Sequence, residues 1–400
     1  MPSFVVEVDD ANGRQGVLDI GGSHVTTPAY VPSDEVSRVA EGFPGIERQN
    51  SLCECDLWVS RGDIDRLRTH PEEKWEVEES VRAQMDDTQS AAKLLHFNFF
   101  SDVTGLEKEA LVHILGLQYR TGADVIEIPH GFCSTRSYER AVQAALEWQR
   151  QTEMDVSLMG VARSTDDLAM LHRYLPNLGG IGIDCRRFEK ALLYQIRRTL
   201  KPEDVWVHAF TAPLQYREVE NRGTLGMLIN WFGVDTVNTI ALSDHARQYF
   251  AGSMARMGVS EWSRCMKKLR YFAPTDYSAL TFGMLEEEYG RECRLSRFCG
   301  CPVCRNLTIG DALDSQLELY RMNHFHRAFA YDEECRKYQH ALKNNETDRF
   351  LEKRPYATEI IRRSSGMLVS TPMRRFQPRV SDEAGRSPSS QAAMQKMVMR

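Results

Sequence analysis

Short apolar runs rich in β-branched and aromatic residues alternate with longer amphipathic stretches up to about residue 250. A hairpin, Phe4–Val8 followed by Gly16–Ile20, opens the chain. We predict eight further strands: Pro28–Pro32, Asp56–Ser60, His96–Ser101, Asp124–Pro129, Val156–Val161, Gly180–Asp184, Val205–Phe210 and Thr236–Ala241. Apolar positions with a helical period lie between most of them and predict helices: Lys108–Arg120, Ser137–Thr152, Thr165–Tyr174, Phe188–Leu200 and Arg217–Trp231.

Several of these strands are almost continuously apolar, which is typical of parallel strands covered by helices on both faces. Eight such strands in about 215 residues favour a (β/α)8 TIM barrel, an α/β fold, over an open sheet. A doubly wound sheet is the alternative. In a barrel, functional side chains are expected at the C-terminal ends of the strands.

The strand-helix alternation stops near Gly252, and the following region, Trp262–Gln339, is rich in helix formers and contains a cysteine cluster. From about Arg374 the chain has few large apolar residues and many Ser, Arg and Gln, which predicts disorder. We therefore predict three parts. They are a barrel with its N-terminal hairpin (1–255), a small zinc-binding helical subdomain (256–345), and a C-terminal extension (346–400) that is disordered from about residue 374.

The overall charge gives no sign of a nucleic-acid partner, because the formal net charge is -6. A polyanion would have to be bound by a local basic patch. No apolar run approaches the roughly 18 residues that span a bilayer, and the N-terminus lacks the features of a signal peptide. We therefore expect a cytoplasmic protein with no membrane partner, in which the ten cysteines are reduced.

Three cysteines close together, Cys299, Cys301 and Cys304, form a C-x-C-x2-C loop. Zinc takes four soft or borderline ligands in a tetrahedron, and such a loop can supply three of them. The fourth ligand should come from His324 or His326 on a following helix, with Cys293 as a competing ligand. The separate pair Cys53 and Cys55 has no partner pair nearby, and core packing is the better interpretation for it.

This cysteine motif, followed some 20 to 26 residues later by histidine, resembles the zinc site of the tRNA-guanine transglycosylases. In that family the histidine often begins a segment like H-N-L-Y-V-x-x-E-E-I-R, and His326–Arg336 (HRAFAYDEECR) matches it without a gap. The resemblance selects His326 over His324. It also implies a structural Zn²⁺, since four protein ligands leave no position for water.

A second match lies near the N-terminus. Gly13–Ile20 and His24–Pro32 (HVTTPAYVP) resemble the family's opening A-R-x-G-x-L and H-G-x-V-x-T-P-x-F-M-P. The resemblance covers roughly residues 4–340 and implies a (β/α)8 barrel with a zinc subdomain near its last strand. Relatives commonly dimerise through the zinc region, so a homodimer or heterodimer through this region is an expectation.

The resemblance also implies a reaction. The family exchanges guanine in a polynucleotide for a 7-deazaguanine through a covalent glycosyl-aspartate, with a second carboxylate that transfers protons. Phe99–Gly105 (FFSDVTG) resembles the family's L-T-D-S-G-G, which implies that Asp102 is the general acid/base. The alternative role for Asp102 is to cap a helix that starts near Leu106.

The nucleophile position departs from the family pattern. The family motif G-[VIA]-D-x-F-D-[CS] aligns with Gly233–Thr239 (GVDTVNT), which places Asn238 where the attacking aspartate is expected. A neutral amide cannot form the glycosyl ester. Either Asp235 or Asp244 replaces it, or the exchange is a single displacement, or the chain is a non-catalytic member of the family.

Residues that contact the base have also diverged from the family's motifs. Polar side chains near predicted strand ends are the candidates for substrate binding: Glu127, His130, Arg163, Asp184 and His208. Each of them could instead be a packed or hydrogen-bonded residue of the scaffold. Together they would form a polar ring at the barrel mouth, where a base pocket is expected. Four arginines are candidates for phosphate contacts: Arg247, Arg294, Arg297 and Arg305.

The leading hypothesis is a base-exchange glycosyltransferase that replaces guanine in tRNA by a 7-deazaguanine. A close variant would act on guanine in DNA. A different class of function is a silent subunit that binds nucleic acid or an active paralogue, which Asn238 favours. A further alternative is an unrelated zinc-bearing barrel enzyme.

Overall fold

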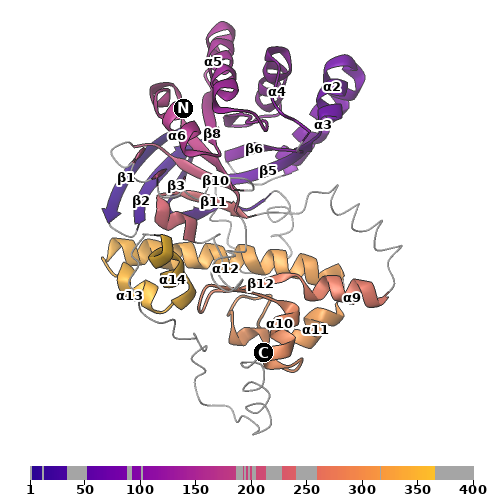
Figure 1. Cartoon of the computed structure of the whole chain (residues 1–400), viewed down its shortest axis with the longest axis vertical. Coiled ribbons are helices and arrows are strands. Elements are labelled where there is room, and N and C mark those ends of the chain that lie inside the picture. The colour runs from indigo at the N-terminus through magenta and orange to yellow at the C-terminus, as the bar shows by residue number, and fades with distance from the viewer. Residues whose placement is uncertain are drawn as a thin grey trace. The chain divides into compact units, whose positions relative to one another are not determined.

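The computed structural model describes residues 2–10, 13–33, 52–87, 92–100, 102–185, 204–212, 228–239, 259–315 and 317–364, with a few single positions between 192 and 200. These residues contain a barrel of parallel strands, an N-terminal meander and a mainly helical C-terminal region (Figure 1). Within the described part, no helix combines the length and the apolar character needed to cross a membrane.

Eight parallel strands form one curled sheet in the order β4-β11-β10-β9-β8-β7-β6-β5. They are β4 (Ala29–Tyr30), β5 (Leu52–Val59), β6 (Ala92–Phe99), β7 (Val125–Ile128), β8 (Ser157–Ala162), β9 (Gly180–Asp184), β10 (Val207–Ala212) and β11 (Thr236–Thr239). The two edge strands meet where the Glu54 amide donates to the Pro32 carbonyl at 3.1 Å, beside a parallel bridge between Ser33 and Glu54. The predicted TIM-like barrel is confirmed, with every predicted strand present and only the bounds shifted.

Helices cover the outer face of the strands, as the apolar strand pattern requires (Figure 1). The helix α4 (Lys108–Arg120) has the predicted bounds, and α5 (Thr135–Thr152) and α6 (Thr165–His172) lie within two residues of theirs. Two helices were not predicted, α2 (Arg61–Thr69) and α3 (Pro71–Asp87). The helix expected at Phe188–Leu200 lies mostly outside the described residues, as does Arg217–Trp231, which ends in the 3-10 helix η3 (Leu228–Phe232).

The N-terminal segment is a three-stranded antiparallel meander that fills the N-terminal end of the barrel. It consists of β1 (Ser3–Asp10), β2 (Gly13–Ile20) and β3 (Ser23–Thr26), so the predicted hairpin has a third strand. Its apolar side chains share one core with residues at the starts of the barrel strands. That core contains Phe4, Leu18, Ile20 and Val25 from the meander and Ala29, Leu52, Ala92, Val125 and Trp206 from the barrel.

A buried ion pair joins this meander to the barrel. Arg14 on β2 donates from Nε and Nη2 to the two carboxylate oxygens of Asp235, at 2.8 and 2.5 Å. Asp235 Oδ2 also accepts from the Val207 amide at 2.7 Å, and Arg14 Nη2 donates to the Val205 carbonyl at 2.7 Å. Both side chains are at most 5% exposed, so each charge depends on the other for its compensation.

The described C-terminal region is mainly helical. It contains α9 (Val259–Lys267), β12 (Arg270–Ala273), β13 (Ser278–Thr281), α10 (Phe282–Tyr289), η4 (Leu295–Arg297), α11 (Ile309–Asp314), α12 (Leu317–Lys343), α13 (Thr347–Glu352) and α14 (Pro355–Ser364). The β12–β13 hairpin was not predicted, and α13 and α14 lie in the segment expected as an extension. The disorder expected from about residue 374 lies outside the described residues.

The long helix α12 packs on the barrel. The Tyr331 ring stacks on the Tyr30 ring of β4 at 5.6 Å, and on Phe272 of β12 at 4.7 Å. Gln339 donates from Nε2 to the carbonyls of Thr26 and Pro28, at 3.0 and 2.8 Å. One helix therefore contacts the barrel, the meander and the β12–β13 hairpin.

Removing one partner of the Arg14–Asp235 pair should destabilise the fold strongly. We expect Arg14→Met to lower the free energy of unfolding by about 3–5 kcal/mol, because it leaves a buried carboxylate without its counter-charge. Urea denaturation monitored by circular dichroism measures this. The control is Arg173→Met, which removes an exposed pair with Glu139 and should cost less than about 1 kcal/mol.

The double variant Arg14→Met/Asp235→Asn removes both charges and should recover part of the loss. An Arg14→Met protein as stable as the Arg173→Met control would contradict a clamping role for the pair.

Candidate functional site

Three cysteines and one histidine form a buried cluster in the C-terminal region. Cys299, Cys301 and Cys304 lie on the loop after η4, and His326 lies on α12. Their ligand atoms are all within 4.8 Å of one another. The Nδ1 atom of His326 is 3.5 Å from Cys301 Sγ and 3.2 Å from Cys304 Sγ. Zinc bonds of about 2.3 Å to sulfur and 2.1 Å to nitrogen would place tetrahedral ligand atoms roughly 3.6 Å apart. The donor set and its spacing therefore fit a metal such as zinc.

The surroundings of His326 orient it as a ligand. Its Nε2 donates to the Phe272 carbonyl at 2.7 Å, which leaves the Nδ1 lone pair facing the thiols. The imidazole stacks on the Tyr271 ring at 4.2 Å, with an angle of 4° between the planes. The Tyr271 hydroxyl lies 3.2 Å from Cys304 Sγ. The unpredicted β12–β13 hairpin thus supplies the groups that support the cluster.

The other candidate ligands lie elsewhere. His324 contacts Ser33 Oγ through Nε2 at 3.2 Å and accepts from Arg327 at Nδ1, so His326 is confirmed as the histidine of the cluster. Cys293 is half-buried and does not belong to the cluster. Cys53 and Cys55 are buried on β5, in agreement with a packing role.

Inside the barrel, side chains change from apolar to polar along the strands. Inward-facing positions alternate along a strand, and those near the strand starts belong to the apolar core that the meander closes. Buried polar side chains also face inward, two of them already near a strand start (Glu54 and Thr236) and the others farther along their strands: His96, Asn98, Glu127, Arg163, Asp184, His208 and Asn238. The C-terminal half of the interior is therefore the part of the barrel equipped for chemistry.

A hydrogen-bonded chain passes through His208 at mid-barrel. Trp206 Nε1 donates to Thr236 Oγ1 at 2.7 Å, Thr236 Oγ1 lies 2.8 Å from His208 Nδ1, and His208 Nε2 lies 2.7 Å from Glu54 Oε2. A neutral imidazole with its proton on Nε2 satisfies this chain. Burial, reinforced by the nearby His96, lowers the pKa of His208 to about 3, which agrees with a neutral ring. His208 was predicted to bind substrate, but both of its ring nitrogens contact protein groups, Thr236 and Glu54.

A second imidazole-carboxylate pair joins β6 and β7. His96 Nδ1 lies 2.7 Å from Glu127 Oε2, which also accepts from the Phe97 amide at 3.2 Å. Burial opposes a charge on His96, but the carboxylates of Glu127, Glu54 and Asp56 outweigh it and raise the pKa of His96. The Gln118 side chain accepts from the Glu127 backbone N–H and donates to the Glu127 carbonyl.

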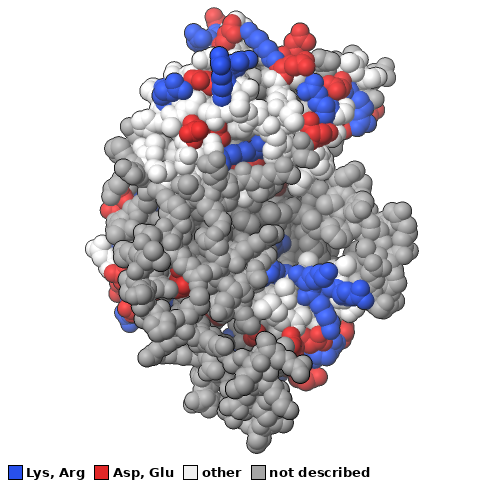
Figure 2. Space-filling view, in the orientation of Figure 1, with Lys and Arg blue, Asp and Glu red and all other residues white. Residues whose placement is uncertain are grey.

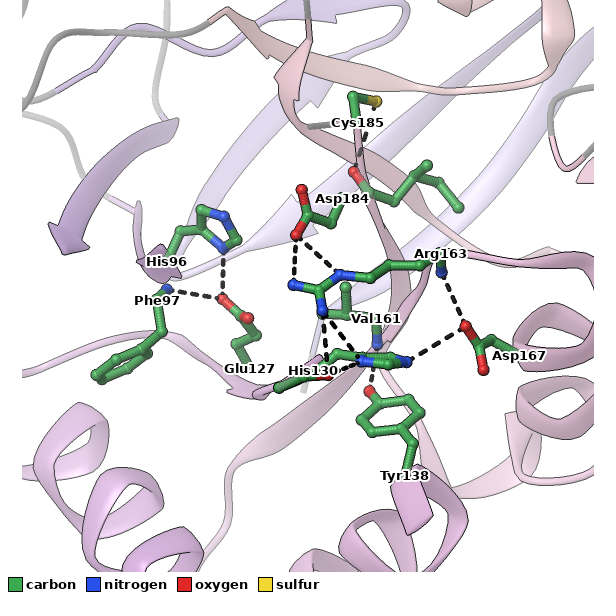
Figure 3. A network of polar contacts seen from close by, with 12 residues as sticks. His96, Phe97, Glu127, His130, Tyr138, Val161, Arg163, Asp167, Asp184 and Cys185 are labelled. Carbon is green, nitrogen blue, oxygen red and sulfur yellow. Dashed lines mark hydrogen bonds and ion pairs between the residues drawn. The ribbon is translucent and has the colours of Figure 1, made fainter. Parts of the chain in front are cut away.

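The strand ends of β7, β8 and β9 are joined through Arg163 (Figure 3). Its Nε and Nη2 donate to Asp184 Oδ2 at 3.0 and 2.7 Å, its Nη1 donates to the Gly131 carbonyl at 3.1 Å, and the guanidinium lies over the Phe132 ring. His130 stacks on Tyr138, and its Nε2 lies 3.3 Å from Asp167. The predicted substrate residues His130, Arg163 and Asp184 thus lie together and bind one another.

The candidate catalytic carboxylates are in different environments. Asp102 is exposed on the loop after β6, and its Oδ2 accepts from the Arg61 amide in the first turn of α2 at 3.0 Å, so its hydrogen bond goes to α2 and not to the helix near Leu106. Asp235 precedes β11, at the N-terminal end of the barrel, and both of its oxygens are engaged in the pair with Arg14. Asp244 lies outside the described residues.

Asn238 is buried on β11, and neither its Nδ2 nor its Oδ1 has a hydrogen-bond partner among the described residues. The same is true of His96 Nε2 and Asn98 Oδ1 on β6. His96 and Asn98 were not predicted as site residues. The sequence LLHFNFF carried a usable signal, because polar residues at alternate positions of an apolar barrel strand face the same side.

The candidate phosphate-binding arginines are exposed where they are described. Arg294, Arg297 and Arg305 lie around the cysteine loop, and the Arg297 guanidinium lies over the Tyr289 ring at 5.3 Å. Arg247 lies outside the described residues. Figure 2 shows Lys and Arg side chains gathered in the region of α9, whose last turn carries Arg264 and Lys267.

Compared with models of known protein families and with curated proteins, the sequence matches none of them.

The cysteine-histidine cluster predicts metal binding. We expect about one equivalent of zinc per chain by elemental analysis, and loss of this metal with a marked fall in melting temperature for Cys301→Ser, because the loop and α12 lose their common ligand. The control is Cys293→Ser, which should keep the metal. Metal-free wild-type protein that melts at the temperature of the loaded form would contradict the site.

The network around Asp167 predicts a pH dependence of stability. Burial opposes ionisation of Asp167, but hydrogen bonds from His130, Thr135 and the Arg163 amide outweigh it and lower its pKa to about 2. A lowered pKa contributes stability above the unfolded value of 3.8, about 2 kcal/mol here, and this is lost as pH falls toward 2.

Denaturation of wild type and Asp167→Asn at pH 2 to 6 measures this contribution. We expect the stability difference between the two proteins to shrink as pH falls below about 4. A difference that does not change with pH would show that Asp167 is not held as a carboxylate.

Proposed function

We propose that this chain is a base-exchange glycosyltransferase that replaces guanine in tRNA by a 7-deazaguanine. The observation that carries the proposal is the set of buried polar groups inside the barrel, where the Asn238 amide has no hydrogen-bond partner among the described residues and lies at the position of the family's catalytic motif. The buried Cys3His cluster at the place expected from the resemblance supports it further.

In the proposed reaction, a carboxylate attacks ribose C1′ and the bond from C1′ to guanine breaks. Guanine leaves with a proton from the general acid, and the incoming base then displaces the carboxylate and gives a proton back. We assign proton transfer to Asp102, because it lies after a barrel strand and is exposed. Asp244 is the proposed nucleophile, because the oxygens of Asp235 are occupied by Arg14 and Val207.

Zinc would have a structural role in this protein. Cys299, Cys301, Cys304 and His326 would hold the ion with four protein ligands, which leaves no position for substrate or water. The bound metal would join the loop after η4 to α12, and α12 in turn packs on β4 through Tyr331. The metal therefore takes no part in the proposed reaction steps.

For the polynucleotide, the proposed contacts are Arg294, Arg297 and Arg305, because exposed guanidinium groups bind phosphate in two-pronged geometry. The target base must leave its stack to enter the barrel. Single-stranded tRNA loops make this step less costly than duplex DNA does, which is why we place tRNA before DNA as substrate.

A second candidate function is a non-catalytic subunit that binds nucleic acid or an active paralogue. Asn238 favours it, since an amide at the nucleophile position cannot form the glycosyl ester. In this case the barrel would still bind a base but would leave the glycosidic bond intact.

Exchange of labelled guanine into tRNA, and separately into duplex DNA, tests the proposal. We expect exchange into tRNA by the wild type, a loss of about 10²–10⁴-fold for Asp102→Asn, and no measurable exchange for Asp244→Asn. Both variants should melt near the wild-type temperature.

Asp235→Asn is the matched control, because it should lower the melting temperature through Arg14 but retain exchange at a temperature where it is folded. Exchange into DNA alone would identify DNA, and not tRNA, as the substrate. Absence of exchange into either polymer would overturn the enzymatic proposal in favour of the silent subunit.

A further inference from the structure

Four buried side-chain atoms in the C-terminal half of the barrel have no hydrogen-bond partner among the described residues. They are Nδ2 and Oδ1 of Asn238, Nε2 of His96 and Oδ1 of Asn98. These side chains are at most 1% exposed. A buried polar group without a partner costs about 1–3 kcal/mol, so four of them in one region require an explanation.

The three residues face the same interior. His96 and Asn98 are two apart on β6 and therefore point to the same side of the sheet. The His96 ring stacks on Phe210 of β10 at 4.1 Å, with 10° between the planes, so β6 and β10 side chains meet across the barrel. On the neighbouring strands β10 and β11, Ala209 pairs with Val237 and the register then shifts, so Asn238 follows this pair on β11 as Phe210 follows it on β10.

The orientation of two of the groups is fixed by their other contacts. Asn98 Nδ2 donates to Asp56 Oδ1, which assigns the free atom of Asn98 as an acceptor. His96 Nδ1 is directed at the Glu127 carboxylate, so its free Nε2 accepts when the ring is neutral and donates when the ring is protonated. Asn238 offers one donor and one acceptor side by side.

Other buried asparagines differ from Asn238. Asn323 on α12 donates from Nδ2 to the Arg270 carbonyl at 2.8 Å, and Asn230 contacts Cys335 Sγ at 3.7 Å. Within the described part of the chain, Asn323 and Asn230 each have one side-chain atom without a partner, whereas Asn238 has two. An amide that is wholly unsatisfied yet buried is expected where a ligand completes the hydrogen bonds, at a cost to stability.

We propose that Asn238, His96 and Asn98 recognise the lactam edge of an uncharged bicyclic base, an oxopurine or its 7-deaza analogue. The Asn238 amide pairs with the ring N–H and the adjacent carbonyl of this edge. Asn98 Oδ1 accepts from the exocyclic amine, and His96 Nε2 contacts a ring nitrogen or the carbonyl. The inference rests on the proposed function for its substrate class. It assigns recognition to these three residues and a scaffold role to Arg163, Asp184 and His208, which already bind protein groups.

Glu127 is a positioning residue in this arrangement, because it acts on the base only through His96. Burial alone would disfavour a proton on His96, and the carboxylates around the ring favour it. The His96–Glu127 pair can therefore present either a donor or an acceptor to a base at His96 Nε2, without movement of the strand.

Equilibrium dialysis with labelled guanine tests the proposal on the full chain. We expect Asn238→Leu to weaken guanine binding at least tenfold. The same variant should melt at or above the wild-type temperature, because an apolar side chain of similar size replaces an unsatisfied buried amide. Asn323→Leu is the matched control, which should bind guanine like the wild type even if its stability falls.

A competition measurement needs no variant. Unlabelled guanine should displace labelled guanine from the wild type, whereas 1-methylguanine should compete at least tenfold less well, because its methyl group blocks the ring N–H. Equal competition by the two bases, or unchanged guanine binding by folded Asn238→Leu, would overturn the inference.

These outcomes are separate from the exchange assay. Guanine binding that depends on Asn238, without exchange into any polymer, would support the inference and overturn the proposed enzyme. Exchange into tRNA that proceeds equally well in Asn238→Leu would support the proposed enzyme and overturn the inference.

Discussion

Closure of the parallel sheet is the constraint on which the rest of this structure depends. The hydrogen bond between the Glu54 amide and the Pro32 carbonyl joins the two edge strands, so every inward side chain must find its partners inside the barrel. At the strand starts that requirement is met by apolar packing against the meander, which the Arg14–Asp235 pair holds in place. Farther along the strands it is met by ion pairs and hydrogen bonds, although His96, Asn98 and Asn238 each keep at least one side-chain atom that has no partner among the described residues.

Much of the architecture could be predicted from the sequence, for physical reasons. Buried parallel strands appear in the sequence as short apolar runs such as Ser157–Ala162. Because helical patterns repeat between these runs, few folds other than a barrel fit the sequence. The metal-binding loop could also be predicted, because three thiols this close in the sequence have few roles other than binding a metal. The choice of His326 over His324 came from the resemblance, and the Phe272 carbonyl that orients it shows why only one of them fits.

The remaining features depend on contacts between distant segments, which local patterns do not encode. Asp235 looked like a candidate nucleophile until its partner proved to be Arg14, 221 residues earlier in the chain. Likewise, Arg163 and Asp184 were predicted as base-binding groups but are paired with each other. The helices α2 and α3 and the β12–β13 hairpin were not predicted, and the four-residue strands of the hairpin lie in a region whose composition favours helix.

A high-resolution crystal structure grown with guanine would show whether the barrel interior around Asn238 receives a base. We expect a planar ligand whose ring N–H and carbonyl lie within hydrogen-bond distance of the Asn238 amide, beside His96 and Asn98. Ordered water molecules that satisfy all four atoms, with no base bound in the barrel at saturating guanine, would contradict it.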